Sequence, residues 1–178
     1  MSEKLQLSVS LEDLRQDTSI NHFDSGDGEL NDFLLNDAKK YQSSLLAVTY
    51  LMKNSEEIFA YFSLSNDRLI KDSSGNSEWN RLNRSIANDK RRRNYPAVKI
   101  GRLAVAKKYA GIGLGKIIIN KVINMYAKVK AQAGCRFVTV DAYQNALGFY
   151  QKNGFAFLTE QDSSEETRAM YLDLKAFV

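Results

Sequence analysis

The chain has 178 residues, of which 44% are hydrophobic and 26% charged, and its net charge is +4. This composition fits a globular domain with a buried core and excludes a fibre, a repeat array and a disordered chain. The longest apolar runs are too short to cross a bilayer, the charged start lacks the apolar region of a signal peptide, and the single cysteine, Cys135, excludes an internal disulfide and a cysteine zinc site. We therefore expect a single domain over residues 1–178, in the cytoplasm, with no metal.

Positive charge is concentrated in one part of the chain. From Arg81 to Lys108 there are ten basic residues and one acid, a net charge of +9 that leaves −5 for the rest. The densest run is Arg91, Arg92 and Arg93. Such a block is typical of an anion-binding surface, a nucleic-acid contact or a solvated loop, and composition alone leaves these three interpretations open.

The first half of the chain predicts a helix and then a hairpin. Apolar residues recur at helical spacing over 27–42, after a turn at 23–28 that carries capping residues. β-Branched and aromatic residues dominate 45–52 and 58–65, which predicts two strands joined in a hairpin. Residues 66–94 are polar throughout, and we expect a loop with a short helix there that contacts the substrate.

The second half alternates strands and helices. Residues 97–105 predict a buried strand opened by the only proline, Pro96. A glycine turn follows, and the apolar face of Leu114–Val129 predicts a long helix. The remaining predicted elements are a strand at 136–143, a short helix at 145–155, and strands at 156–160 and 168–174. The sequence thus predicts a mixed α+β fold, with antiparallel strands on both sides of a parallel pair.

The glycine turn KKYAGIGLGK, from Lys107 to Lys116, suggests a phosphate site. The N–H groups at a helix start lack intrahelical partners, and glycine lets a phosphate approach the backbone closely. The turn does not match the P-loop, because Ala110 replaces the first glycine and Ile117 the hydroxyl residue. It does not match the dinucleotide fingerprint either, because its third glycine, Gly115, comes one residue early.

The turn resembles that of the GNAT acetyltransferase superfamily, Gln/Arg-x-x-Gly-x-Gly/Ala, with Lys108 in the first position and Gly111 and Gly113 in the glycine positions. The strand KIGRLAV, the long helix, the strand RFVTVDAY and the segment NALGFYQKNGF also resemble this family. The segment FDSGDGELNDFLLNDAKKYQ is similar to the first helix of the acetyltransferase toxins of toxin–antitoxin modules. The resemblance covers most of the chain and implies a single GNAT-like domain, with a mostly antiparallel sheet, a splayed parallel pair and flanking helices.

The resemblance also implies a cosubstrate and a site. It implies acetyl-CoA, bound by backbone groups before the turn, by the turn itself and by lysines at its rim. The implied contacts are Leu103, Val105, Lys108, Gly111, Gly113, Gly115 and Lys116. It further implies that Tyr150, the tyrosine of the family's Phe-Tyr pair, protonates the departing thiolate, since a phenol has a pKa of about 10. Without the resemblance, Tyr150 reads as a core aromatic residue.

These residues predict an N-acetyltransferase in which a primary amine attacks acetyl-CoA directly. A small amine or a protein amine is the first expectation for the acceptor. The resemblance to the toxins adds the α-amine of an aminoacyl-tRNA, which Arg91, Arg92 and Arg93 would suit. The alternative from another class is a catalytically silent module that binds CoA or nucleic acid. The protein partners considered are an antitoxin and a second copy of the chain, and the general base stays unassigned.

Overall fold

The computed structural model describes residues 10–70, 80, 84, 94–128 and 133–178. By its internal contacts the chain divides into two compact units. The first unit is Met1–Ser65 with Gly101–Ile118, and the second unit is Asn66–Ile100 with Ile119–Val178. Within the described residues, no helix has both the length and the apolar character needed to cross a membrane.

In the part of the chain that the structure describes, seven strands form a mixed sheet in the order β1-β2-β3-β4-β5-β7-β6. The strands are β1 (Ser10–Asp13), β2 (Val48–Lys53), β3 (Ile58–Ile70), β4 (Asn94–Val105), β5 (Phe137–Tyr143), β6 (Ala156–Phe157) and β7 (Thr167–Asp173). β4 and β5 run parallel, with Ala97 opposite Phe137, whereas β1–β2, β2–β3, β5–β7 and β6–β7 pair antiparallel. The predicted α+β fold with a parallel pair is therefore confirmed.

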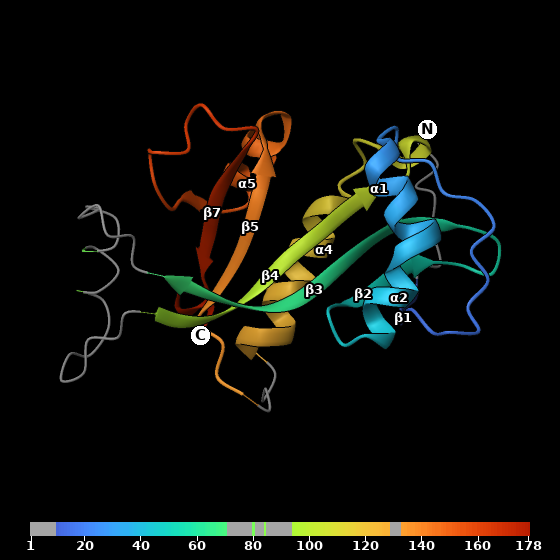
Figure 1. Ribbon diagram of the computed structural model, residues 1–178, viewed down its shortest axis with the longest axis horizontal. Helices are drawn as coiled ribbons and strands as arrows, with labels where there is room; N and C mark the ends of the chain where they lie inside the picture. Colours follow the sequence, from blue (N-terminus) through green and yellow to red (C-terminus); the bar gives the residue numbers. More distant parts are fainter. Residues whose placement is uncertain (1–9, 71–79, 81–83, 85–93, 129–132) are drawn as a thin grey trace, which may run out of the picture. The chain divides into compact units, whose positions relative to one another are not determined.

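In the first unit, a helical stretch runs from α1 (Gly28–Asp32) through the π-helical turn η1 (Phe33–Asp37) to α2 (Ala38–Ser43), as Figure 1 shows. Asp27 caps its start, because its Oδ1 accepts hydrogen bonds from the N–H groups of Glu29 (2.9 Å) and Leu30 (3.1 Å). The predicted helix over 27–42 is confirmed. The spacing did not reveal the π-helical turn, in which the N–H of Ala38 donates to the carbonyl of Phe33.

The end of α2 contains a strained residue. The N–H of Leu46 donates to the carbonyl of Tyr41 (2.9 Å) and that of Leu45 to the carbonyl of Gln42 (3.1 Å), the two bonds of a Schellman turn. Leu45 takes the left-handed φ of 58°, where glycine is usual. Its side chain is 93% exposed, so no packing compensates for the strain.

We expect Leu45→Gly to raise the free energy of unfolding by about 1 kcal/mol. The left-handed region costs an L-residue about 1–2 kcal/mol, and glycine removes this strain. Part of the stabilisation is lost again, because glycine loses more conformational entropy on folding than leucine does. Urea denaturation measures the change. Leu46→Gly is the control, since Leu46 is also exposed but has an ordinary φ, and it should be neutral or destabilising. Equal effects of the two substitutions would contradict the strain.

The two hairpin strands differ from their predicted bounds. β2 begins at Val48 and not at residue 45, because the preceding residues belong to the cap of α2. β3 is longer than predicted and continues to Ile70, so the predicted loop over 66–94 is wrong at its start. The loop is also wrong at its last residue, because Asn94 begins β4. The rest of it, at 71–79, 81–83 and 85–93, lies outside the described residues, and the described positions 80 and 84 are helical. β1 was not predicted, because its sequence SLED has no clear apolar alternation.

The second unit contains the parallel pair and the strands beyond it. β4 begins at Asn94, so Pro96 lies inside the strand and does not open it. β5 and β7 pair over their full lengths, which confirms both predicted strands, and they lie side by side in Figure 1. Their core cluster consists of Leu69, Tyr95, Ala97, Phe137 and Tyr171.

Two helices matter for the site. α4 (Leu114–Ile123) runs through both units and continues as the π-helical turn η3 (Asn124–Lys128), which confirms the predicted long helix as far as the chain is described there. α5 (Leu147–Lys152) follows the 3₁₀ turn η4 (Gln144–Ala146) in the second unit. The predicted final strand pair is confirmed for β7, whereas β6 has two residues in place of the predicted five.

Candidate functional site

The glycine turn lies between the end of β4 and the start of α4, after the 3₁₀ turn η2 (Lys107–Tyr109). Gly111 and Gly113 have φ values of 80° and 92°, in the left-handed region that favours glycine. A β-carbon added to either glycine would meet no neighbouring atom within 4 Å. The backbone conformation therefore demands glycine here, and the space above the turn is open.

The start of α4 presents backbone donors. The N–H of Ile117 donates to the carbonyl of Gly113 at 3.1 Å, which makes this the first intrahelical bond. The N–H groups from Gly113 to Lys116 thus precede the regular ladder and carry the partial positive charge of a helix start. Lys116 is exposed and adds a full charge to the same end. This arrangement fits an anionic group such as a phosphate.

Leu103 and Val105 lie two positions apart on β4, so both side chains project on one face of the strand. Both are half-buried, and Ala104 between them is buried. Since these residues directly precede the turn in the first unit, the structure brings together all seven predicted cofactor contacts in one continuous segment.

Backbone contacts fix the segment that enters the turn. The N–H of Ala106 donates to the carbonyl of Phe59 and that of Lys107 to the carbonyl of Asp24, each at 2.8 Å. The rings of Phe59 and Tyr109 also meet edge to face, with centroids 4.8 Å apart. The turn is therefore attached both to β3 and to the loop before α1.

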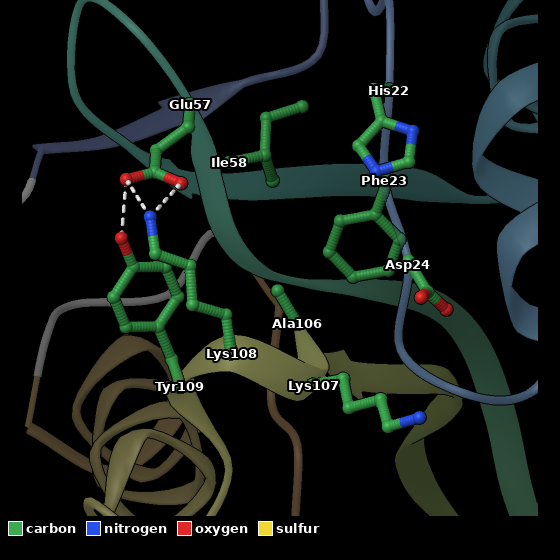
Figure 2. Close-up of a pocket in the computed structure, with 9 residues that line it drawn as sticks. All are labelled: His22, Phe23, Asp24, Glu57, Ile58, Ala106, Lys107, Lys108 and Tyr109. Carbon is green, nitrogen blue, oxygen red and sulfur yellow. Dashed lines mark hydrogen bonds and ion pairs between the residues drawn. The ribbon is translucent and has the colours of Figure 1, made fainter.

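A carboxylate from the β2–β3 hairpin contacts the turn as well. Figure 2 shows Glu57 accepting a hydrogen bond from the hydroxyl of Tyr109, while the amine of Lys108 lies 3.3 Å from both of its oxygens. The Tyr109 hydrogen bond, assisted by Lys108, lowers the pKa of Glu57. The contacts of Lys108 with Tyr109 and then with Glu57 raise the pKa of Lys108, so Glu57 and Lys108 are both charged at neutral pH. The sequence alone gives Glu57 no role, because nothing in a hairpin glutamate 51 residues before Lys108 indicates this contact.

This cluster lines a cavity of about 390 Å³. Phe23, Ile58 and Ala106 form the apolar part of the lining, and His22, drawn in Figure 2, lines the cavity as well. The amine of Lys107 points away from Glu57 in the same view. The single histidine therefore lies near the glycine turn, although no residue pattern predicted this.

Tyr150 belongs to the second unit, on α5. Its side chain is 6% exposed, and its ring packs edge-on against Phe149 and Phe155, with centroids 5.0 and 5.2 Å away. Burial raises the pKa of Tyr150, so the phenol keeps its proton at neutral pH. Among the residues that the structure describes, none forms a hydrogen bond with its hydroxyl. The packing suits a core residue, and the free hydroxyl also suits a proton donor.

The predicted substrate residues Arg91, Arg92 and Arg93 lie outside the described residues. The predictions therefore divide into three groups: the cofactor segment in the first unit, Tyr150 in the second unit, and the arginine run, for which the structure gives no position.

Comparison with known proteins identifies the class of enzyme. The sequence profile of the acetyltransferase (GNAT) domain matches residues 85–172. A tyrosine-to-phenylalanine mutant of KacT superposes with a TM-score of 0.77 and 21% identity, over 94% of this chain and 96% of its own. AtaT complexed with acetyl-methionyl-tRNAfMet gives a TM-score of 0.77 and 21% identity, over 95% and 96%. AtaTR bound with acetyl-CoA superposes with a TM-score of 0.75 and 22% sequence identity, over 94% of this chain and 95% of its own.

At these identities the structural likeness establishes a shared fold. No curated protein matches the sequence. The profile match includes the glycine turn, α4, β5 and α5, which are the elements that carry the predicted site. Residues 85–172 therefore match the acetyltransferase (GNAT) domain, and the chain shares the fold of the AtaT toxin over nearly its whole length.

Proposed function

We propose that the protein is an N-acetyltransferase that moves the acetyl group of acetyl-CoA to a primary amine by direct attack in a ternary complex. The observation that carries the proposal is the turn before α4, with its two left-handed glycines, open space and backbone donors. These are the features that a pyrophosphate requires of a backbone site. The GNAT profile match supplies the reaction class.

In this proposal the cofactor follows the segment from Leu103 to Lys116. Backbone groups of Leu103 and Val105 pair with the pantetheine and thioester, and the turn binds the pyrophosphate through the N–H groups around Gly113. Gly111 and Gly115 permit the close approach, while Lys108 and Lys116 add charge at the rim. Most of the expected contacts are therefore made by the main chain, so many side chains of this segment can be apolar.

The chemistry requires a neutral amine and an acid. The nitrogen lone pair attacks the thioester carbon, the C–S bond breaks, and the thiolate takes a proton from the phenol of Tyr150. The proton released by the amide nitrogen then returns to the phenol through water. Because burial raises the pKa of Tyr150, the phenol is protonated before each turnover.

Release of CoA thiol from acetyl-CoA, measured with a panel of amines, tests this function. Thiol release that depends on both the amine and acetyl-CoA is the expected result. A chain that binds acetyl-CoA but releases no thiol with any acceptor would be the silent module instead.

An aminoacyl-tRNA is the second candidate acceptor. The net charge of +9 between Arg81 and Lys108 favours it, and AtaT, which has the same fold, has been solved with acetyl-methionyl-tRNAfMet. A basic block could neutralise RNA phosphates and release their counterions. The same block includes Lys107 and Lys108 beside the CoA turn, so part of its charge serves the cofactor under either candidate.

We expect reversal of Arg91, Arg92 and Arg93 to glutamate to weaken tRNA binding by at least about tenfold, and to flatten the dependence of log affinity on log salt. Fluorescence anisotropy with an aminoacylated tRNA measures both quantities. Reversal of Lys39 and Lys40 on α2, outside the basic block, is the control. Wild-type binding that does not change with salt, or no binding, would remove tRNA and leave a small or protein amine.

Two further partners belong to this proposal. An AtaT mutant has been solved bound to the C-terminus of the antitoxin AtaR, and by analogy we propose an antitoxin for this chain. A second copy is the other partner, which size-exclusion chromatography with light scattering tests directly. Because acetyl-CoA is consumed, we propose the cytoplasm as the location.

A further inference from the structure

Glu57 is held rigidly beside the glycine turn. In the β2–β3 hairpin, the side-chain Oδ1 of Asn54 accepts hydrogen bonds from the N–H groups of Glu56 and Glu57, each at 2.8 Å. The N–H of Asn54 in turn donates to the carbonyl of Glu57 at 3.1 Å. These three bonds fix the backbone from which the Glu57 carboxylate reaches the turn.

The carboxylate has two partners of different kinds. Tyr109 is 7% exposed, and its buried ring packs on Phe59, so the hydroxyl that donates to Glu57 has a fixed position. Lys108 is 70% exposed, and its amine lies 3.3 Å from both Glu57 oxygens and 5.1 Å from the centre of the Tyr109 ring. Tyr109 therefore orients the carboxylate, and the carboxylate attracts the lysine.

We propose that the carboxylate of Glu57 competes with the phosphates of the cofactor for the amine of Lys108. The inference rests on the proposed function, because it needs a phosphate at the turn. Lys108 lies three positions before Gly111, so a single amine has two anions within its reach: Glu57 on the hairpin and the phosphate on the turn.

The solvent exposure of the Glu57–Lys108 ion pair limits how much the competition can change the affinity for CoA. A solvent-exposed ion pair is weak, so a phosphate can replace Glu57 as the partner of Lys108 at a cost of up to about fivefold in affinity. The phosphate end is the same in acetyl-CoA and in CoA, and tighter binding there would not lower the chemical barrier. Glu57 thus limits how strongly the enzyme retains its product.

A double-mutant cycle with CoA as the probe tests the competition. Glu57→Gln keeps an oxygen that accepts from Tyr109 and removes the charge. By isothermal titration calorimetry, we expect Glu57→Gln to tighten CoA binding about three- to fivefold when Lys108 is present. In a Lys108→Gln background, the same substitution should tighten binding by less than about twofold, because only the repulsion between Glu57 and phosphate is then removed.

Each outcome of the cycle has a definite meaning. An equal gain in both backgrounds would overturn the competition, since Glu57 would act by repulsion alone. Weaker binding in Glu57→Gln would also overturn it and would make the carboxylate a structural anchor. If the wild-type chain binds no CoA, the proposed function itself fails; if it binds CoA and the cycle shows no coupling, only the inference fails.

Two controls separate this role from a general effect of charge or folding. Asp37→Asn removes a carboxylate from another exposed ion pair, with Lys40 at 3.0 Å, and changes the net charge by the same amount. It should leave CoA affinity unchanged. Acetyl-pantetheine lacks phosphates, so the same double-mutant cycle measured with it should show no coupling between Glu57→Gln and Lys108→Gln. Coupling with this short donor would contradict the competition.

Discussion

Tyr150→Phe is expected to lower kcat by about 10²–10⁴-fold, the usual effect of losing a general acid. The substitution keeps the ring, which packs edge-on against Phe149 and Phe155. It removes only the hydroxyl, which has no hydrogen-bond partner among the described residues, so the free energy of unfolding should change by less than about 1 kcal/mol. Acetyl-CoA affinity should stay at the wild-type level, because proton transfer occurs in the transition state and not in the bound ground state.

Tyr171→Phe is the matched control for this experiment. Tyr171 is another buried tyrosine of the second unit, 3% exposed and packed edge-on against Phe137, and it lies outside the proposed site. Its replacement should leave kcat unchanged, even if the fold becomes less stable. Normal turnover by Tyr150→Phe would refute the mechanism, and the thiolate would then take its proton from water.

The pH dependence of kcat follows from the environment of Tyr150. Burial disfavours the phenolate and raises the pKa of Tyr150 above its ordinary value of 10.0. The acid therefore stays protonated throughout the usual assay range, and Tyr150 should cause no fall in kcat below about pH 10. Above that pH the unfolded chain releases this proton before the folded chain does, so the group then lowers stability as the pH rises. A kcat profile that loses activity near pH 8 would need another titrating group.

Gly113→Asp is expected to weaken acetyl-CoA binding by about 100-fold or more. The new carboxylate would face the proposed pyrophosphate site at the start of α4, and two like charges about 4 Å apart repel by about 4 kcal/mol in a partly exposed site. The φ of 92° adds backbone strain to any residue with a β-carbon, although no neighbouring atom blocks that carbon. Calorimetry with acetyl-CoA measures the loss.

Gly113→Asn separates charge from strain. Asparagine has the shape of aspartate, tolerates left-handed φ better than other L-residues and carries no charge. We expect it to weaken binding by less than about tenfold, so that most of the loss in the aspartate variant is electrostatic. If both variants bind acetyl-CoA as wild type does, the glycine turn is not the pyrophosphate site.

The sequence by itself determined most of the helices and strands and the resemblance to the acetyltransferase (GNAT) domain. Helical spacing over 27–42 and strand-like composition at 58–65 and 136–143 identified elements that the structure contains, because side-chain periodicity reflects which face of an element is buried. The positions of Gly111 and Gly113 were equally readable, since a left-handed backbone selects glycine whatever surrounds it. Both features depend on residues that are close in sequence, so both can be predicted from the sequence.

What only the tertiary structure decided depends on contacts between distant residues. The π-helical turn at Phe33–Asp37 and the left-handed Leu45 run against local preference, so the sequence predicted neither. Glu57 reaches Lys108 and Tyr109 across more than fifty residues. The hairpin lies beside the turn because the N–H of Ala106 donates to the carbonyl of Phe59 and the rings of Phe59 and Tyr109 meet. The partners of the Glu57 carboxylate are distant in sequence, so only the folded chain shows which groups contact it and shift its pKa.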